Sequence, residues 1–450
     1  MKDLLTDAAE RAQRYLALVQ ERSVAPTASA LAALSQLDEP LPEMPCDAAH
    51  VLQRLDEIVS PATMAMAGPR FFGFVIGGAL PVTVASSWLT TAWDQNAGLP
   101  AAITGVAHLE QVALRWLLEV LDLPRDAAGA FVTGATVANL TALAAARHRV
   151  LARAGWSVEA DGLFGAPPIN VLVGGEVHPT VAKALGVLGL GRARVQRLAV
   201  DSQGRIRADK LPELAGPTII CVQAGNVNTG AFDPIAAIAG RAREAGAWLH
   251  VDGAFGLWAR AAPARAGLAA GVELADSWAT DGHKWLNVPY DSGIAFVRDA
   301  EALRSAMAVT ADYLPSGTQR NPSDYTPELS RRARGVDVWA ALASLGRSGV
   351  AELVERCCRH AARFAAGLAA AGYEVLNEVV LNQVLVSFGS DARTRQVIER
   401  LQQDGTCWCG VTVWQARTAM RISVSSWATT DEDVTRSLAA MLRIAGAATD

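Results

Sequence analysis

The sequence is poor in charge. Only 19% of its 450 residues are charged, 51% are hydrophobic, and the net charge is −5 at pH 7. Disordered chains need low hydrophobicity and high net charge, so this composition excludes a disordered protein. The sequence also lacks the basic surplus that would neutralise a phosphate backbone. We therefore expect no nucleic acid partner.

Cysteine is scarce as well. Six cysteines in a chain of this length do not form the dense framework of a disulfide-stabilised secreted domain. Two close pairs occur, Cys357-Cys358 and Cys407-x-Cys409, but no His or Cys pair completes a zinc-like spacing. We expect reduced cytosolic thiols and no metal site.

Targeting and membrane segments are also missing from the pattern. The N-terminal MKDLLTDAAERAQRY spreads its charges at helical spacing and has no apolar core of a signal peptide. The longest uncharged run, Phe71–Trp93, contains several Gly residues and Pro81, which makes it a poor lipid-facing helix. It is interpreted as buried or interface structure. We expect a cytoplasmic location and no membrane partner.

The middle of the chain alternates short β-rich runs with alanine-rich helical stretches. This alternation predicts a mostly parallel α/β sheet. The predicted strands are Ala130–Thr133, Asn170–Val173, Thr218–Val222, Trp248–Val251, Ser277–Thr280 and Ile294–Val297. Helical periodicity marks residues 1–60, and a polar Pro- and Gly-containing segment at 310–330 predicts a mobile loop. Helices at Val336–Leu345 and Val350–Ala370, with short strands near Gln383–Phe388 and Arg421–Ser425, predict a smaller α+β domain.

Unusual polar residues follow five of the predicted strands directly. In open α/β sheets, ligands bind outside the carboxyl ends of the strands. These strand ends therefore predict one functional rim. The residues are Thr133-Gly134-Ala135-Thr136, the segment from Gly174 to His178, Gly225-Asn226, Asp252-Gly253-Ala254 and Asp281-Gly282-His283-Lys284.

The segment TGATVANLTALAAAR begins with a tight Gly turn and continues as a strong helix. Backbone N–H groups at such a helix start, with the Thr136 hydroxyl, suit a phosphate, although an ordinary N-cap turn explains the same residues. Asp252 ends a run that reads as buried, where a carboxylate needs a cationic partner. A protonated pyridine nitrogen would serve, and so would a structural Arg or a helix N-terminus. Ala254 keeps the neighbouring space open for a flat ring.

Lys284 lies between His283 and Trp285 in a nearly apolar setting. Burial favours the neutral amine that a Schiff base requires, whereas the alternative is a surface lysine. His178 suits stacking over a ring, although an isolated His is more often structural.

Together these segments resemble the group II pyridoxal-dependent decarboxylases, which include glutamate, aromatic-amino-acid and diaminobutyrate decarboxylases. The resemblance is carried by TGATVANLTALAAAR, His178, HVDGAFG, DGHKWLNVPYDSG and SRRARGVDVWAALASLG, and covers about residues 65–430. It implies a fold-type-I PLP-dependent transferase-like fold. The implied parts are an N-terminal helical dimerisation segment at 1–76, a large PLP-binding domain at 77–346 and a small C-terminal domain at 347–450.

The resemblance also implies a role for each matching residue. Lys284 would form the internal aldimine with pyridoxal 5'-phosphate, Asp252 would pair with the pyridine nitrogen, and His178 would stack on the ring. The remaining cofactor contacts implied are Ala135, Thr136, Asn226, Ala254, Asp281 and His283. Substrate contacts are implied for Phe74, Asn96 and Arg421, and the proton donor on the loop would be Tyr325, with Tyr313 as the second candidate. The implied assembly is a homodimer with shared active sites.

The predicted activity is decarboxylation of an L-amino acid to its amine, through an external aldimine and a quinonoid. Two positions depart from the decarboxylase pattern, Asn226 and Asp281, and both are similar to the sphingosine-phosphate lyase branch. A carbon–carbon lyase is therefore the alternative, and a non-catalytic PLP-binding subunit is a third hypothesis. Phe74-Val75-Ile76-Gly77 replaces a segment that supplies aromatic side chains in the aromatic decarboxylases, which argues against an aromatic substrate. The segment Trp93–Asn96 is similar to the diaminobutyrate branch.

Overall fold

A computed structural model describes residues 1–99, 103–309 and 320–448. The chain forms two compact units, one of residues 79–359 and 377–383, the other of residues 1–78, 360–376 and 384–450. The division into parts 1–76, 77–346 and 347–450 stays a prediction. None of the helices in the described part of the chain combines the length and apolar character that a bilayer-spanning segment requires.

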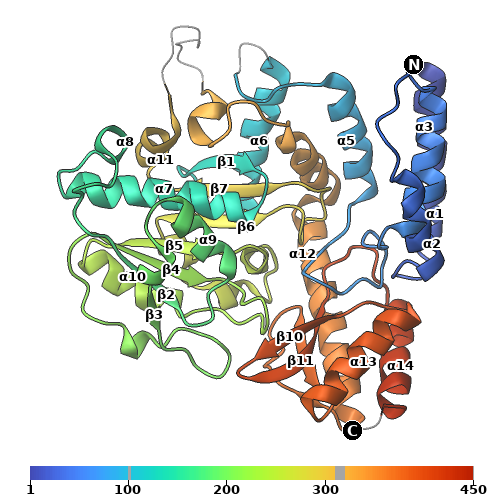
Figure 1. Ribbon diagram of the computed structural model, residues 1–450. Helices are drawn as coiled ribbons and strands as arrows, with labels where there is room; N and C mark the ends of the chain where they lie inside the picture. Colours follow the sequence, from blue (N-terminus) through green and yellow to red (C-terminus); the bar gives the residue numbers. More distant parts are fainter. Residues whose placement is uncertain (100–102, 310–319, 449–450) are drawn as a thin grey trace. The chain divides into compact units, whose positions relative to one another are not determined.

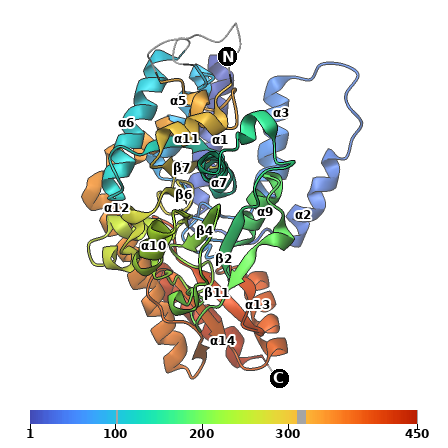
Figure 2. The same cartoon turned by 90° about the vertical axis from the view of Figure 1, so that its left-hand side faces the viewer.

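The larger unit is built on a seven-stranded sheet with the order β1-β7-β6-β5-β4-β2-β3. Figure 2 shows β7, β6, β4 and β2 following one another across it. The strands are β1 (Ala128–Val132), β2 (Asn170–Gly174), β3 (Gln196–Leu198), β4 (Thr218–Gln223), β5 (Trp248–Asp252), β6 (Ser277–Asp281) and β7 (Gly293–Val297). All pairs are parallel except those of β7, which runs antiparallel to both β1 and β6. All six strands predicted for this region are present, and the expected α/β fold with a mostly parallel sheet is confirmed.

One face of this sheet carries an apolar core. Alternate strand residues, such as Val171 with Val173 and Ile219 with Cys221, point to the same face and pack with α7 (Ala135–Arg153). Helix α7 lies against β5, β6 and β7 and between α9 and α11 (Figure 1). Because α7 starts directly after β1, its N-terminus is fixed at the edge of the sheet where β1 ends.

The other helices of this unit surround the sheet and supply its connections. They are α5 (Pro81–Trp93), α6 (Thr104–Val120), α8 (Val158–Asp161), α9 (Pro179–Val187), α10 (Ile235–Glu244) and α11 (Ala300–Met307). Short helices follow at η3 (Arg192–Arg194), η4 (Ala208–Lys210), η5 (Gly256–Ala261), η6 (Ala266–Ala269), η7 (Val272–Leu274) and η8 (Pro322–Tyr325). Helix α12 (Arg334–Ala370) is interrupted at Gly346, whose φ of 59° breaks the helical geometry. The interruption agrees with the two helices predicted for this stretch.

The smaller unit combines N-terminal helices with a four-stranded sheet of order β10-β11-β9-β8. Its elements are α1 (Lys2–Leu18), α2 (Ala28–Ala33), η1 (Leu34–Leu37), α3 (Ala48–Arg54), η2 (Leu55–Val59), α4 (Ser60–Ala62), β8 (Glu374–Val375), β9 (Gln383–Ser387), α13 (Asp391–Asp404), β10 (Gly410–Trp414), β11 (Arg417–Ser423) and α14 (Asp431–Gly446). Its strand pairs β8–β9 and β10–β11 are antiparallel. The expected α+β texture of the C-terminal region is therefore present.

Candidate active site

Five strands of the large sheet end at one edge, and the predicted rim residues lie there. Strands β1, β2, β4, β5 and β6 point the same way, so their carboxyl ends meet on one side. Strand β7 runs the other way, so its first residue, Gly293, lies opposite Asp281 at that edge. A Cβ atom at position 293 would lie 2.4 Å from the Cα of Gly134, which is too close for any side chain. Glycine at this position therefore allows β7 to lie close to the start of α7.

Lys284 follows β6 and reaches back to its last residue. Its Nζ lies 3.0 Å from Oδ2 of Asp281, whose side chain is 2% exposed. The other carboxylate oxygen, Oδ1, accepts a hydrogen bond of 2.6 Å from the backbone N–H of Ala135, the first residue of α7. The predicted amine and the predicted phosphate turn are thus brought together by one buried carboxylate.

Asp252 ends β5 and is 5% exposed. Burial raises the pKa of its carboxyl group, while the nearby His178, Lys284 and the backbone N–H of Ala254 lower it. Oδ1 accepts that Ala254 N–H at 3.3 Å, and the carbonyl of Ala254 accepts the N–H of Asp281 at 2.9 Å. Ala254 therefore ties the ends of β5 and β6 together, and Asp252 is a buried carboxylate beside cationic groups.

His178 caps the start of α9 at the same edge. Its Nδ1 lies 2.7 Å from the Thr180 hydroxyl and accepts the Thr180 N–H at 3.4 Å. These contacts fix the ring close enough to Asp252 to influence the pKa of that carboxyl group. The structure thus groups His178, Asp252 and Lys284. Thr136 lies half-buried in the first turn of α7.

His283 stacks against the ring of Tyr290, a residue that was not predicted to belong to the site. The Tyr290 ring stacks on it with centroids 4.2 Å apart. Nδ1 of His283 accepts the backbone N–H of Ser292 at 3.0 Å, and burial lowers the pKa of the imidazole. Tyr290 belongs to the segment DGHKWLNVPYDSG, and its closeness to Lys284 in the sequence could have identified it as a site residue.

Asn226 organises the loop after β4. It is 2% exposed, and its Oδ1 accepts the backbone N–H groups of Asn228 and Thr229 at 2.9 and 3.2 Å. Its Nδ2 donates to the carbonyl of Glu176 at 3.4 Å, which links this loop to the one after β2. These contacts give Asn226 a structural role. Its contact with a cofactor stays a prediction.

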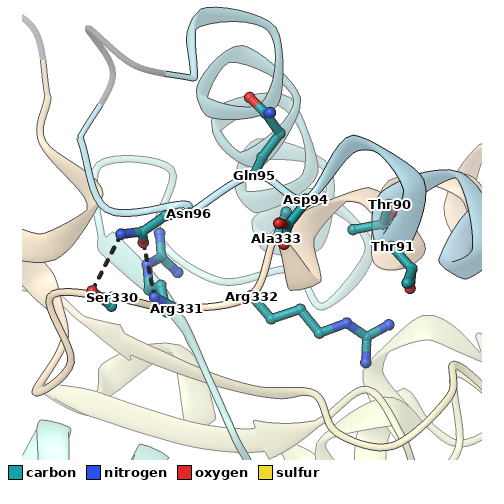
Figure 3. Close-up of a pocket in the computed structure, with 9 residues that line it drawn as sticks. All are labelled: Thr90, Thr91, Asp94, Gln95, Asn96, Ser330, Arg331, Arg332 and Ala333. Carbon is teal, nitrogen blue, oxygen red and sulfur yellow. Dashed lines mark hydrogen bonds between the residues drawn. The ribbon is translucent and has the colours of Figure 1, made fainter. Parts of the chain in front are cut away.

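Asn96 lines a pocket of about 600 Å³ in the large unit. Figure 3 shows its side chain held by the segment after η8, with Oδ1 accepting the N–H of Arg331 at 3.0 Å and Nδ2 donating to the Ser330 hydroxyl at 3.2 Å. Arg332 also lines the pocket, and its Nη1 donates to the carbonyl of Tyr290 at 3.3 Å. Neither Arg332 nor this link between the pocket and the ring on His283 was predicted.

Tyr325 belongs to the segment 310–330, which was expected to be a mobile loop. Residues 310–319 lie outside the described residues, and in the remainder η8 ends at Tyr325, which packs against the apolar core beside α11. Arg320 lies over its ring and donates to the carbonyl of Gly129, near the start of β1. The rim residues follow the end of β1. Within one chain, Tyr325 is therefore not grouped with Lys284, because Arg320 and the core hold it elsewhere. Tyr313 lies outside the described residues.

Phe74 and Arg421 belong to the other compact unit. Phe74 is 59% exposed, with its ring 5.3 Å from that of Trp408. Arg421 pairs with Gly410 in the small sheet, and burial lowers the pKa of its guanidinium group. Their contact with substrate stays a prediction.

Comparison with known proteins identifies the family. The sequence profile of the pyridoxal-dependent decarboxylase conserved domain matches residues 31–389. The chain belongs to this family.

Similar decarboxylases come from bacteria and plants. The chain is 28% identical over 334 residues to an aromatic-L-amino-acid decarboxylase of Bacillus atrophaeus, covering 71% of this chain and 67% of that one. It is 27% identical over 427 residues to tryptophan decarboxylase 1 of Oryza sativa subsp. japonica, covering 83% and 80%. This protein is a PLP-dependent amino-acid decarboxylase, and the comparisons do not support the alternative of a carbon–carbon lyase.

Solved structures agree on the fold. Oryza sativa TDC, crystallised with PLP and tryptamine, superposes with a TM-score of 0.92 at 22% identity over 99% of this chain and 97% of that one. Mouse CSAD in its apo form gives a TM-score of 0.89 at 20% identity over 98% of both chains. The predicted fold-type-I PLP-dependent transferase-like architecture is confirmed.

The rim of this decarboxylase has the donor set that PLP needs. Lys284 offers an amine for the aldehyde, the start of α7 offers N–H groups for the phosphate, and Asp252 offers a buried carboxylate for the pyridine nitrogen. His178 lies beside that carboxylate. The residues therefore fit the cofactor. Asp281 is the one residue whose charge does not suit the cofactor, because its carboxylate accepts the Ala135 N–H that a phosphate would bind.

Proposed function

We propose that the edge defined by Lys284, Asp252, His178 and the start of α7 is where this enzyme decarboxylates its L-amino acid. The supporting observation is the grouping itself: a lysine amine, a buried carboxylate and a helix N-terminus lie at strand ends on one edge of the sheet. PLP, when bound, supplies the electron sink for the pair of electrons released as the α-carboxylate leaves. Lys284 binds the cofactor's aldehyde carbon, and Ala135 and Thr136 hold its phosphate.

Asp252 keeps a proton on the pyridine nitrogen. A carboxylate that is 5% exposed gains most from a positively charged partner, because burial otherwise disfavours its charge. His178 would stack on the cofactor's ring and orient the substrate, since the contact with Thr180 fixes the position of its imidazole. Ala254 and His283 also contact the cofactor.

The enzyme works as a homodimer, with α5 in the interface. Four large apolar side chains of this 13-residue helix are exposed, and a patch of this kind marks an interaction surface. They are Val82 (37%), Trp88 (46%), Leu89 (54%) and Trp93 (45%). The helix leads directly to Asn96 and the pocket of Figure 3, so the partner subunit covers a region next to the substrate.

The enzyme acts in amino-acid metabolism in the cytoplasm. Its six cysteines are free thiols, which suits a reducing compartment. Asn96 contacts the substrate, and the substrate contacts of Phe74 and Arg421 stay predictions.

A substrate panel tests this function. The purified PLP-loaded enzyme is incubated with aromatic, acidic and basic L-amino acids, and carbon dioxide, amine and aldehyde are measured. We expect one amino acid to give equal amounts of carbon dioxide and amine. Aldehyde without carbon dioxide, or no turnover with any member of the panel by an enzyme that binds PLP, would contradict the proposal.

A further inference from the structure

One buried carboxylate occupies both ends of the proposed cofactor site. Oδ1 of Asp281 accepts the Ala135 N–H at 2.6 Å, and Oδ2 lies 3.0 Å from Nζ of Lys284. These two nitrogens are the groups proposed to meet the cofactor's phosphate and its aldehyde. In the free protein, Asp281 therefore neutralises the lysine and satisfies the first N–H of α7.

The backbone holds Asp281 firmly in this position. Its N–H donates to the carbonyl of Ala254 at 2.9 Å, and its own carbonyl accepts the indole N–H of Trp258 at 3.1 Å. It pairs with Gly293, whose close approach to Gly134 fixes the distance between β7 and α7. The carboxylate therefore cannot leave the start of α7 through a shift of the strand.

The surroundings of Asp281 do not offset a second negative charge there. Lys284 and His283 are the cationic groups beside it, with Nε2 of His283 at 3.7 Å, and burial lowers the pKa of that imidazole. Asp252 and Tyr290 also face Asp281, and burial first, then the charge of Asp281, raises the pKa of both groups. A phosphate carries between one and two negative charges near neutral pH and would meet a carboxylate that is 2% exposed.

We propose that Asp281 competes with the cofactor's phosphate for the start of α7, so that phosphate binds together with one proton. The proton comes from solvent and bridges the carboxylate and a phosphate oxygen, which replaces repulsion by a hydrogen bond. This inference rests on the proposed phosphate site at Ala135 and Thr136. Its consequence is that affinity for the cofactor falls as pH rises.

The test uses 4-deoxypyridoxine 5'-phosphate, a cofactor analogue without the aldehyde that would react with Lys284. Its affinity for the wild-type apoprotein, measured by titration calorimetry at pH 6, 7 and 8, should fall by up to about tenfold per pH unit, the limit for uptake of one proton. Asp281→Asn should bind the analogue about tenfold or more tightly than wild type at pH 8, because juxtaposed like charges are costly in a desolvated site. The difference between variant and wild type should shrink toward pH 6.

Two controls isolate the phosphate. 4-Deoxypyridoxine, which lacks the phosphate, should bind wild type and Asp281→Asn with similar affinity. Asp291→Asn removes a nearby carboxylate that forms an ion pair with Arg334 instead of bonding to the start of α7. This variant should bind the phosphate analogue as wild type does. Asp281→Ser, which is also neutral, replaces Asp281→Asn if that variant fails to fold.

The outcomes separate this inference from the proposed function. If the neutral variants bind the phosphate analogue no more tightly than wild type at pH 8, the competition does not exist. The proposed function stands in that case, provided that wild type still binds PLP covalently. A wild-type protein that binds neither PLP nor the analogue would contradict both.

Discussion

The guanidinium carbon of Arg320 lies 4.1 Å from the centre of the Tyr325 ring. Arg320 also contacts Glu110 at 3.4 Å and the carbonyl of Gly129, and these contacts keep Tyr325 near the start of β1. If Tyr325 donates the proton that completes the reaction, it therefore acts on the active site of a partner subunit in the proposed homodimer.

Tyr325→Phe should lower amine formation by about 10²–10⁴-fold, the usual contribution of a general acid, and shift products toward a carbonyl compound. Co-expression with Lys284→Ala tests where Tyr325 acts. Mixed dimers should regain activity that neither variant has alone, because one of their two sites would then carry both changes and the other none. Unchanged amine yield in Tyr325→Phe would move the role to another residue.

Asp252→Asn should preserve the fold and lower kcat strongly. The side chain keeps its size, but the charge that holds a proton on the pyridine nitrogen is lost. Removal of a preorganised electrostatic group in a desolvated site costs about 3 kcal/mol in activation free energy. Steady-state kinetics with circular dichroism as a control for folding would measure this. A kcat within a few-fold of wild type would make Asp252 a structural residue.

Glu110→Gln should destabilise the large unit. Glu110 is 2% exposed, and its two oxygens lie 2.7 and 2.6 Å from Nη2 of Arg331, which is itself buried. Breaking a buried ion pair costs about 3–5 kcal/mol because a charge is left without a partner. Urea denaturation should show this loss. Glu119→Gln on the same helix removes an exposed pair with Arg347 and should change stability by less than about 1 kcal/mol.

His250 should make the protein sensitive to acid. Burial lowers the pKa of its imidazole to about 3, and the ring contacts Asn139 and Ser277 at 2.8 and 2.9 Å. Between this value and its unfolded value near 6.5, only the unfolded state binds the proton, so stability is lost as pH falls. In urea titrations from pH 6.5 to 4.5, wild type should lose up to about 1.4 kcal/mol per pH unit more than His250→Gln.

The sheet and its rim could be predicted because they are local in sequence. Buried strands such as Thr218–Gln223 read as continuous apolar runs, and polar residues follow them at once. Strand β3 was missed because two of its three residues are exposed and carry no apolar run. Strand β10 was also missed, although its residues Val411, Thr412 and Val413 are β-branched.

Contacts between residues far apart in the chain could not be predicted from local sequence patterns. Asp281 and Ala135 are 146 residues apart, and nothing in either segment indicates that a carboxylate would occupy the start of α7. The contacts that hold the segment of Tyr325 could not be predicted for the same reason, because Arg320 and Glu110 are 210 residues apart. Pro and Gly in the segment indicated a loop, but buried partners elsewhere in the chain decide its structure.

The attachment of PLP to Lys284 is the central claim, and the chain is well suited to its test because it contains only four lysines, at positions 2, 183, 210 and 284. The PLP-loaded enzyme is treated with borohydride, digested and analysed by mass spectrometry. We expect the cofactor's mass on Lys284 and no label on Lys284→Ala. Labelling of Lys183 on α9 in place of Lys284, or full turnover by Lys284→Ala, would contradict it.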